Sequence, residues 1–155
     1  MTPTRCDECG ASYTERDDSC QARFDQLLAL DHSRQEPWGS RHGLAFAVFA
    51  LQHPRRYGAG SVARSLELIQ RVVRDGEPLA SVVADFRART DTEVPAPIDA
   101  SPRTFAVTIA DLGDFDAASY AHDLQRWARA ALDAHSRAHA KGILSRPRPV
   151  QSGTP

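Results

Sequence analysis

Apolar side chains recur at helical spacing along much of the chain. Val62, Leu66, Ile69 and Val73 follow one another at i, i+4, i+7 and i+11, which places them on one face of a helix. With cap and breaker residues taken into account, the pattern predicts five helices, over about residues 20–31, 40–53, 60–74, 78–89 and 116–140. The predicted fold class is all-α, a single helical bundle of about five helices.

The segment from Leu44 to Leu51 differs from the others because it is apolar on every side. A helix that is hydrophobic all round is buried, so we place this one at the centre of the domain. Ser19 and Ser40 are the expected N-caps of the first two helices, and Pro54 ends the second. A strand is the alternative for so short a run, but three alanines and the lack of alternation favour a helix.

The other segments predict one domain over residues 1–144. Residues 1–19 are polar and lack periodicity, as expected of a cysteine knuckle at the front of the bundle. Residues 90–103 contain three prolines and predict a surface loop, while residues 104–112 fit either a short strand or an irregular packing segment. Residues 145–155, rich in proline, predict a disordered tail.

Composition places the chain among soluble proteins. It has 155 residues, 41% hydrophobic and 25% charged, with a formal net charge of −1, which argues against nucleic acid or an anionic membrane as a partner held by bulk charge. Its longest apolar run is shorter than the roughly 20 residues that span a bilayer, and no signal peptide is visible. We therefore expect a cytoplasmic protein. Eighteen of its 19 basic residues are arginine, which is typical of a GC-rich bacterial genome.

The strongest chemical signal is a group of three cysteines near the N-terminus. Cys6 and Cys9 form a Cys-x-x-Cys pair followed by Gly10, and Cys20 comes eleven residues after Cys9. Such a pair in a tight turn can present two thiolates to one metal ion, so we predict structural Zn²⁺ with a histidine as the fourth ligand. Two alternatives remain: cysteines that bind no metal, and a redox pair, for which the required strand and helix are not predicted.

Helix geometry favours His53 as the fourth ligand. If the first two helices pack antiparallel, the end of the second lies level with Cys20, where His53 is found. His42 lies 11 residues earlier, roughly 16 Å away at 1.5 Å per residue, so both cannot bind one ion. The predicted metal ligands are Cys6, Cys9, Cys20 and His53. Alternatives are that His42 is the ligand, or that His53 only caps a helix C-terminus.

A second histidine group is a weaker candidate. His135 and His139 are spaced i, i+4 on the last predicted helix, and with His42 they could form a three-histidine metal site. Position 136 is serine, so the His-Glu-x-x-His pattern of metallohydrolases is absent. The competing interpretation is that these are buried histidines that form hydrogen bonds. His32 and His122 have no such context and are expected at the surface.

The motifs together resemble a bacterial family of unknown function. The resemblance rests on Cys6-x-x-Cys9-Gly10, on Cys20, and on a central helix that begins His42-x-Leu44 and ends Gln52-His53-Pro54. It extends to Trp127 and the helix of His135 and His139, and covers most of residues 5–140. Some members carry an acidic residue where this chain has Ala47. The resemblance implies the helical fold and the cysteine site, and it implies no activity.

These observations predict a zinc-stabilised helical protein that acts as a binding or regulatory module, with a protein or small molecule as its partner. The alternative is a metal-dependent enzyme that uses His42, His135 and His139 at one end of the bundle. A nucleic-acid-associated zinc knuckle is a third interpretation. The sequence contains no glycine-rich phosphate loop, no nucleophile elbow and no identifiable pair of catalytic carboxylates, so whether the protein is an enzyme stays open at this stage.

Overall fold

The structure, a computed structural model, describes residues 2–89 and 102–145. Its α-helices are α1 (Cys20–His32), α2 (His42–Gln52), α3 (Ala59–Ile69), α4 (Leu79–Ala88) and α5 (Tyr120–Ser145). Short turns are η1 (Gly39–Arg41), η2 (Pro54–Arg56), the π-helical η3 (Gln70–Arg74) and η4 (Ile109–Leu112). Two strands, β1 (Thr4–Arg5) and β2 (Ser12–Tyr13), form the only sheet in this part of the chain. The all-α prediction is confirmed.

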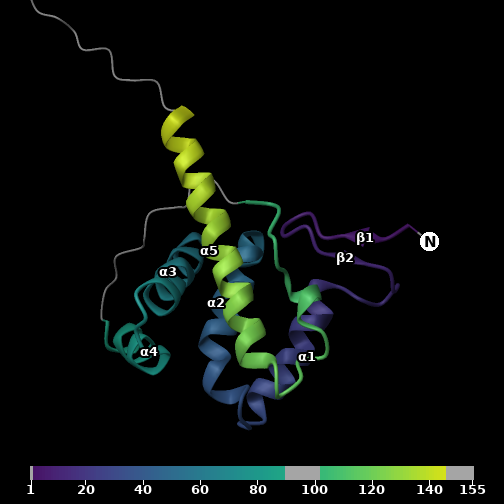
Figure 1. Cartoon of the computed structure of the whole chain (residues 1–155), viewed down its shortest axis with the longest axis horizontal. Helices are drawn as coiled ribbons and strands as arrows, with labels where there is room; N and C mark the ends of the chain where they lie inside the picture. Colours follow the sequence, from purple (N-terminus) through teal and green to yellow (C-terminus); the bar gives the residue numbers. More distant parts are fainter. Residues whose placement is uncertain (1, 90–101, 146–155) are drawn as a thin grey trace, which may run out of the picture.

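Helix α2 lies at the centre of the bundle, as its uniformly apolar sequence predicts. It contacts α1, α3, α4 and α5, with α3 and α4 on one side and α1 and the hairpin on the other (Figure 1). Val48, Phe49 and Leu51 are fully buried, and Phe46 is partly exposed. Trp127 and Tyr120 of α5 are buried against the same core, and Trp38 packs at its rim.

The two predicted N-caps have different outcomes. Ser19 caps α1, because its side chain accepts a hydrogen bond from the Ala22 N–H at 3.1 Å. Ser40 does not cap α2. It lies inside η1, and its hydroxyl donates to the Glu36 carboxylate at 2.6 Å. The side chain therefore bonds a nearby carboxylate instead of a backbone N–H at the start of α2.

Residues 104–112 form no strand, which resolves their ambiguity in favour of irregular packing. Thr108 and Asp111 form a capping box that starts η4 instead. The last helix begins at Tyr120, four residues later than predicted, and extends through Ser145, where the tail was predicted to start. Residues 90–101 of the predicted loop and residues 146–155 of the predicted tail lie outside the described residues.

Gln52, the last residue of α2, fastens three segments together. Its side-chain amide donates to the Val107 carbonyl at 2.9 Å and accepts a hydrogen bond from the Trp127 indole N–H at 2.9 Å. The side chain is fully buried, and both polar ends have partners, so its burial carries little desolvation cost. This contact fixes the end of α2, and the next residue is His53.

Candidate metal centre

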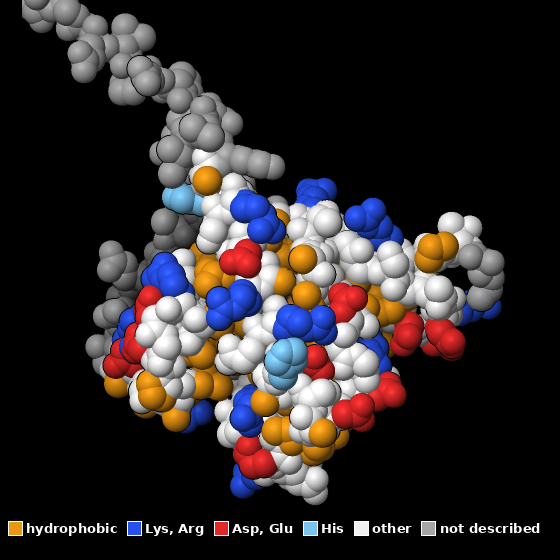
Figure 2. Space-filling model, viewed as in Figure 1, with side chains coloured by type: hydrophobic (Ala, Val, Ile, Leu, Met, Phe, Trp, Pro, Cys, Tyr) orange, Lys and Arg blue, Asp and Glu red, His pale blue; other side chains and the backbone are white. Residues whose placement is uncertain are grey.

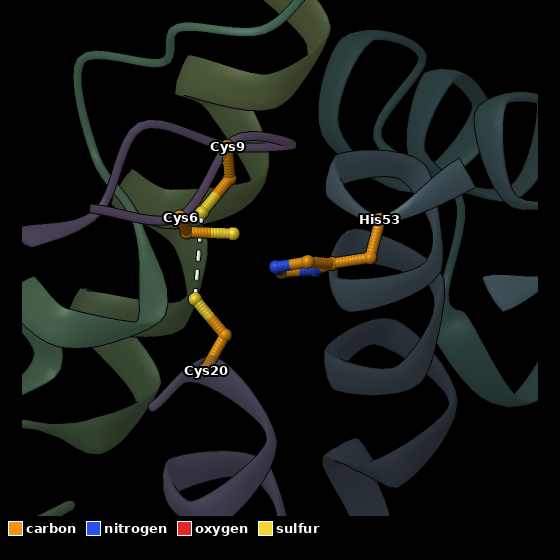
Figure 3. A group of neighbouring side chains, drawn as sticks. All are labelled: Cys6, Cys9, Cys20 and His53. Carbon is orange, nitrogen blue, oxygen red and sulfur yellow. Dashed lines mark hydrogen bonds between the residues drawn. The ribbon is translucent and has the colours of Figure 1, made fainter. Parts of the chain in front are cut away.

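Cys6, Cys9, Cys20 and His53 come together at one end of the α1–α2 pair. Their ligand atoms all lie within 4.8 Å of one another, and the side chains point toward a common centre (Figure 3). The two first cysteines come from the hairpin turn, Cys20 is the first residue of α1, and His53 follows the last residue of α2. The four residues predicted as ligands are therefore neighbours, as the sequence argument required.

The hairpin turn gives Cys6 and Cys9 their positions. The Cys6 N–H donates to the Ala11 carbonyl at 2.8 Å, and the Gly10 N–H donates back to the Cys6 carbonyl at 2.9 Å. Gly10 has φ +86°, a left-handed conformation that favours glycine. A Cβ at this position would also lie 3.3 Å from the Arg103 carbonyl oxygen. Glycine is thus required here by the backbone conformation and by the close approach of residues 103–104.

The antiparallel packing of α1 and α2 decides which histidine reaches the cysteines. Phe24 of α1 and Phe49 of α2 stack with ring centroids 3.9 Å apart, each four residues from the Cys20 and His53 end of the pair. At the far end, His42 of α2 lies against Asp31 of α1. The choice of His53 over His42 as the histidine near Cys20 is confirmed.

The hydrogen bonding of His53 leaves one ring nitrogen available. The side chain is fully buried, and Nδ1 lies 2.9 Å from the Phe49 carbonyl oxygen. Since a carbonyl only accepts, Nδ1 donates to it, and in the neutral imidazole the lone pair then lies on Nε2. Nε2 has no hydrogen-bond partner among the described residues, although it is buried. The orientation is further fixed by stacking on Phe49 at a centroid distance of 4.1 Å.

The thiols lie close enough together to shift one another's pKa values. Cys9 and Cys20 are buried with Sγ atoms 3.5 Å apart, and the Tyr13 hydroxyl donates to the Cys20 Sγ at 3.1 Å. Mainly through the Cys9 thiol, with smaller contributions from His53 and Tyr13, the pKa of Cys20 is lowered to about 4. The same contact and burial raise the pKa of Cys9, because two adjacent buried thiolates repel each other. A divalent cation between the sulfurs would remove that repulsion.

Two acidic residues inside the Cys-x-x-Cys turn tie it to the end of α2. Glu8 is buried, and its carboxylate accepts a hydrogen bond from the Arg55 backbone N–H at 3.0 Å and lies 3.4 Å from the Arg56 guanidinium. Asp7 forms a more exposed ion pair with Arg55. Sequence reasoning missed these contacts and that of Tyr13. The charge complementarity between Asp7-Glu8 and Arg55-Arg56 was the available signal.

The donor set fits zinc. A tetrahedral ion with Zn–S distances of about 2.3 Å holds its sulfurs about 3.8 Å apart, close to the 3.5 Å between Cys9 and Cys20. Three thiols and one imidazole are soft to borderline ligands, which Zn²⁺ prefers. Mg²⁺ and Ca²⁺ prefer oxygen donors instead. The proton on Nδ1 of His53 is held by a backbone carbonyl, the second contact that metal-binding histidines typically make.

The predicted second group of His42, His135 and His139 does not form. His42 is bonded through Nδ1 to Asp31 at the N-terminal end of α2. His135 lies beside Leu51, near the other end of that helix, nine residues or about 13 Å from His42. His139 is exposed. Among the described residues, no second group of histidine, cysteine and acidic side chains is close enough to hold a metal.

The remaining predictions about single residues are confirmed. His32 and His122 are exposed. Trp127 and Tyr120 are core residues, and Trp38 donates its indole N–H to the Phe115 carbonyl at 2.9 Å, which places it at the core's rim. None of the helices in the described residues is both long enough and apolar enough to cross a membrane.

The fold and the site define a small helical protein with a Cys₃His group that could hold a metal ion. Residues 4–136 match a family of unknown function (DUF5946), and the chain belongs to this family. The matched range includes all four residues of the Cys₃His group. No curated protein and no solved structure matches the chain.

Proposed function

We propose that this protein binds one Zn²⁺ through Cys6, Cys9, Cys20 and His53, and that the ion is structural. The observation that supports the proposal best is the Nε2 atom of His53, which is buried, without a partner in the described residues, and directed at three sulfurs. A buried nitrogen left unpaired costs roughly 1–3 kcal/mol. Coordination of a cation would turn that cost into a stabilising contact.

A structural role follows from the composition of the group. Catalytic zinc sites have three protein ligands and an open position for water or substrate, whereas four protein ligands close the coordination sphere. The hairpin also needs support, because it pairs only Thr4 with Tyr13 and Arg5 with Ser12. Two strands of this length have little stability of their own in water. Zinc would fasten the hairpin to the ends of α1 and α2.

We further propose that the zinc-stabilised bundle acts as a binding or regulatory module. Within the described part of the chain, His42 does not join His135 and His139 in a second group that could hold a metal. Acidic and basic side chains are interspersed on the face drawn in Figure 2, without a continuous basic stripe. A protein or a small molecule therefore fits better as a partner than nucleic acid or a membrane surface.

The test is the metal content of protein purified without a metal-affinity tag, measured by elemental mass spectrometry. We expect one zinc per chain in the wild type and close to none in Cys9→Ser or His53→Ala. His42→Ala and His135→Asn are matched controls that change histidines outside the group, and both should retain one zinc. Wild-type protein without metal, or Cys9→Ser with a full equivalent of zinc, would overturn the proposal.

A further inference from the structure

A pocket of about 370 Å³ lies between α2, α3 and α4, apart from the cysteine group. Its volume falls within the range of small-molecule sites, about 300–1,000 Å³. Phe46 and Ala47 of α2 line it, and these residues precede His53 by six or seven positions, or about 10 Å along the helix. The pocket and the proposed zinc site are therefore separate features of the same central helix.

Small residues create the space. Gly43 and Ala47 are one turn apart on α2, and Gly60 of α3 also lines the pocket, so these three positions contribute no long side chain to fill it. Gly43 also faces α4 closely, because a Cβ there would lie 3.2 Å from Val83. Phe46, Leu68 and Phe86 supply apolar walls.

Two polar side chains of α3 also line the pocket. Ser65 is about 95% buried and lines the pocket. Arg64, the preceding residue, also lines the pocket. Its guanidinium forms no ion pair with a described carboxylate, whereas Arg71 and Arg89 of the same region are paired with acidic residues.

The start of α3 adds backbone donors at the same place. Gly58 is the N-cap residue and provides no side-chain hydrogen bond. Gly60 and Ser61, which line the pocket, belong to the first turn, where backbone N–H groups have no partner within the helix. These N–H groups and the helix dipole favour a negative charge.

We propose that this pocket binds a small amphipathic carboxylate. Its carboxylate would interact with Arg64, the Ser65 hydroxyl and the first turn of α3, and its hydrocarbon or aromatic part would lie against Phe46, Leu68 and Phe86. A single arginine beside apolar walls suits a monoanion with an apolar body better than a phosphate dianion. The inference rests on the proposed binding role and names its ligand class, but it does not depend on the zinc ion.

Isothermal titration calorimetry with 4-phenylbutyrate tests the proposal on the full chain. We expect a Kd below about 1 mM, and binding at least tenfold weaker for the neutral isostere 4-phenylbutanamide, for butyrate and for inorganic phosphate. Arg64→Gln should weaken 4-phenylbutyrate binding at least tenfold. Arg129→Gln, which removes an exposed arginine on α5, is the matched control and should bind like the wild type.

A second variant fills the pocket. Ala47→Leu should abolish binding of 4-phenylbutyrate, and circular dichroism will show whether the variant is folded. If Ala47→Leu is not folded, the proposal is tested by the affinity of Arg64→Gln for 4-phenylbutyrate and by the affinity of the wild type for 4-phenylbutanamide. Absence of binding by the wild type, equal binding of the amide, or an unchanged affinity in Arg64→Gln would each overturn the proposal. Zinc content is measured on the same samples, so protein that contains zinc but binds no carboxylate contradicts this inference and leaves the zinc proposal intact.

Discussion

The two ends of the α1–α2 pair each contain a histidine, and the two histidines have opposite environments. His53 is fully buried and directs an unpartnered Nε2 at three sulfurs. His42 is 44% exposed at its side chain and is held by the Asp31 carboxylate, with Nδ1 and Oδ2 2.9 Å apart. Both residues belong to one helix face, since 11 residues complete about three turns. Their sequence spacing therefore does not distinguish them.

The difference lies in what the neighbouring segments bring to each end. At the His53 end, the hairpin turn and the first residue of α1 supply thiols, which are ligands for a soft cation. At the His42 end, α1 supplies a buried carboxylate, whose pKa is raised by burial and lowered in part by His42. One end has the composition of a metal site and the other that of a single hydrogen-bonded histidine–aspartate pair.

His135 provides a third case that sharpens the comparison. Like His53, it is buried, and its Nε2 has no partner in the described residues. Its ring neighbour is Phe105, at a centroid distance of 6.3 Å, and no cysteine is near. A buried imidazole nitrogen without a hydrogen-bond partner therefore indicates a metal site only where other ligand atoms lie close to it.

The largest expected effect comes from removing the metal. Structural zinc contributes about 10–16 kcal/mol in zinc-finger peptides, while whole domains are stable by about 5–15 kcal/mol. Incubation with a strong chelator should lower the melting temperature by more than 10 °C, and added Zn²⁺ should restore it. Circular dichroism melting curves measure this. An unchanged melting temperature in demonstrably zinc-free protein would show that the fold does not depend on the ion.

Alanine substitutions of the histidines at the two ends of α2 should differ in their effect on zinc binding. His53→Ala should abolish zinc binding and destabilise the protein by at least about 3 kcal/mol, since it removes a ligand and leaves a cavity. His42→Ala should keep its zinc and cost about 1–3 kcal/mol, because it leaves Asp31 buried without its partner. Urea unfolding and zinc content measure the two quantities. Equal zinc loss in both variants would contradict the distinction.

A smaller effect is expected from the contacts that hold the Cys-x-x-Cys turn. Glu8→Gln keeps an acceptor for the Arg55 N–H but removes the charge beside Arg56, so it should cost about 0.5–1 kcal/mol and accelerate zinc release. Asp7→Asn changes the neighbouring, exposed carboxylate and should alter neither quantity. Zinc transfer to a chromophoric chelator gives the rate. A faster release in Asp7→Asn than in Glu8→Gln would contradict the assignment.

The smallest effect concerns pH. Burial lowers the pKa of His135 below its ordinary value of 6.5, so the unfolded chain binds the proton more readily than the folded protein. The stability that neutral His135 contributes is complete above about pH 6.5 and decreases as the pH falls below it. The difference in unfolding free energy between wild type and His135→Asn should therefore shrink from pH 7.5 to 5.5. Protonation of the zinc ligands is common to both proteins, and a constant difference would contradict the expectation.

The fold and the cysteine group could be predicted from sequence because they depend on local rules. Periodicity and breakers located the helices, and the antiparallel packing of two adjacent helices selected His53 over His42. The N-cap prediction for Ser40 was wrong because one local contact replaced another: Ser40 bonds Glu36, four residues earlier, instead of capping α2. The sequence left residues 104–112 open between a strand and irregular packing, and there a tertiary contact forms, from Gln52 to the Val107 carbonyl.

The sequence by itself determined the helical class, the buried central helix and the three cysteines of the Cys₃His group, since each follows from spacing along the chain. Only the tertiary structure decided that His53 joins the cysteines, that His42 does not join His135 and His139, and that small residues of α2 and α3 leave a pocket beside Arg64 and Ser65. The physical reason is that spacing fixes which face of a helix a residue occupies. Packing against other helices decides what lies opposite that face.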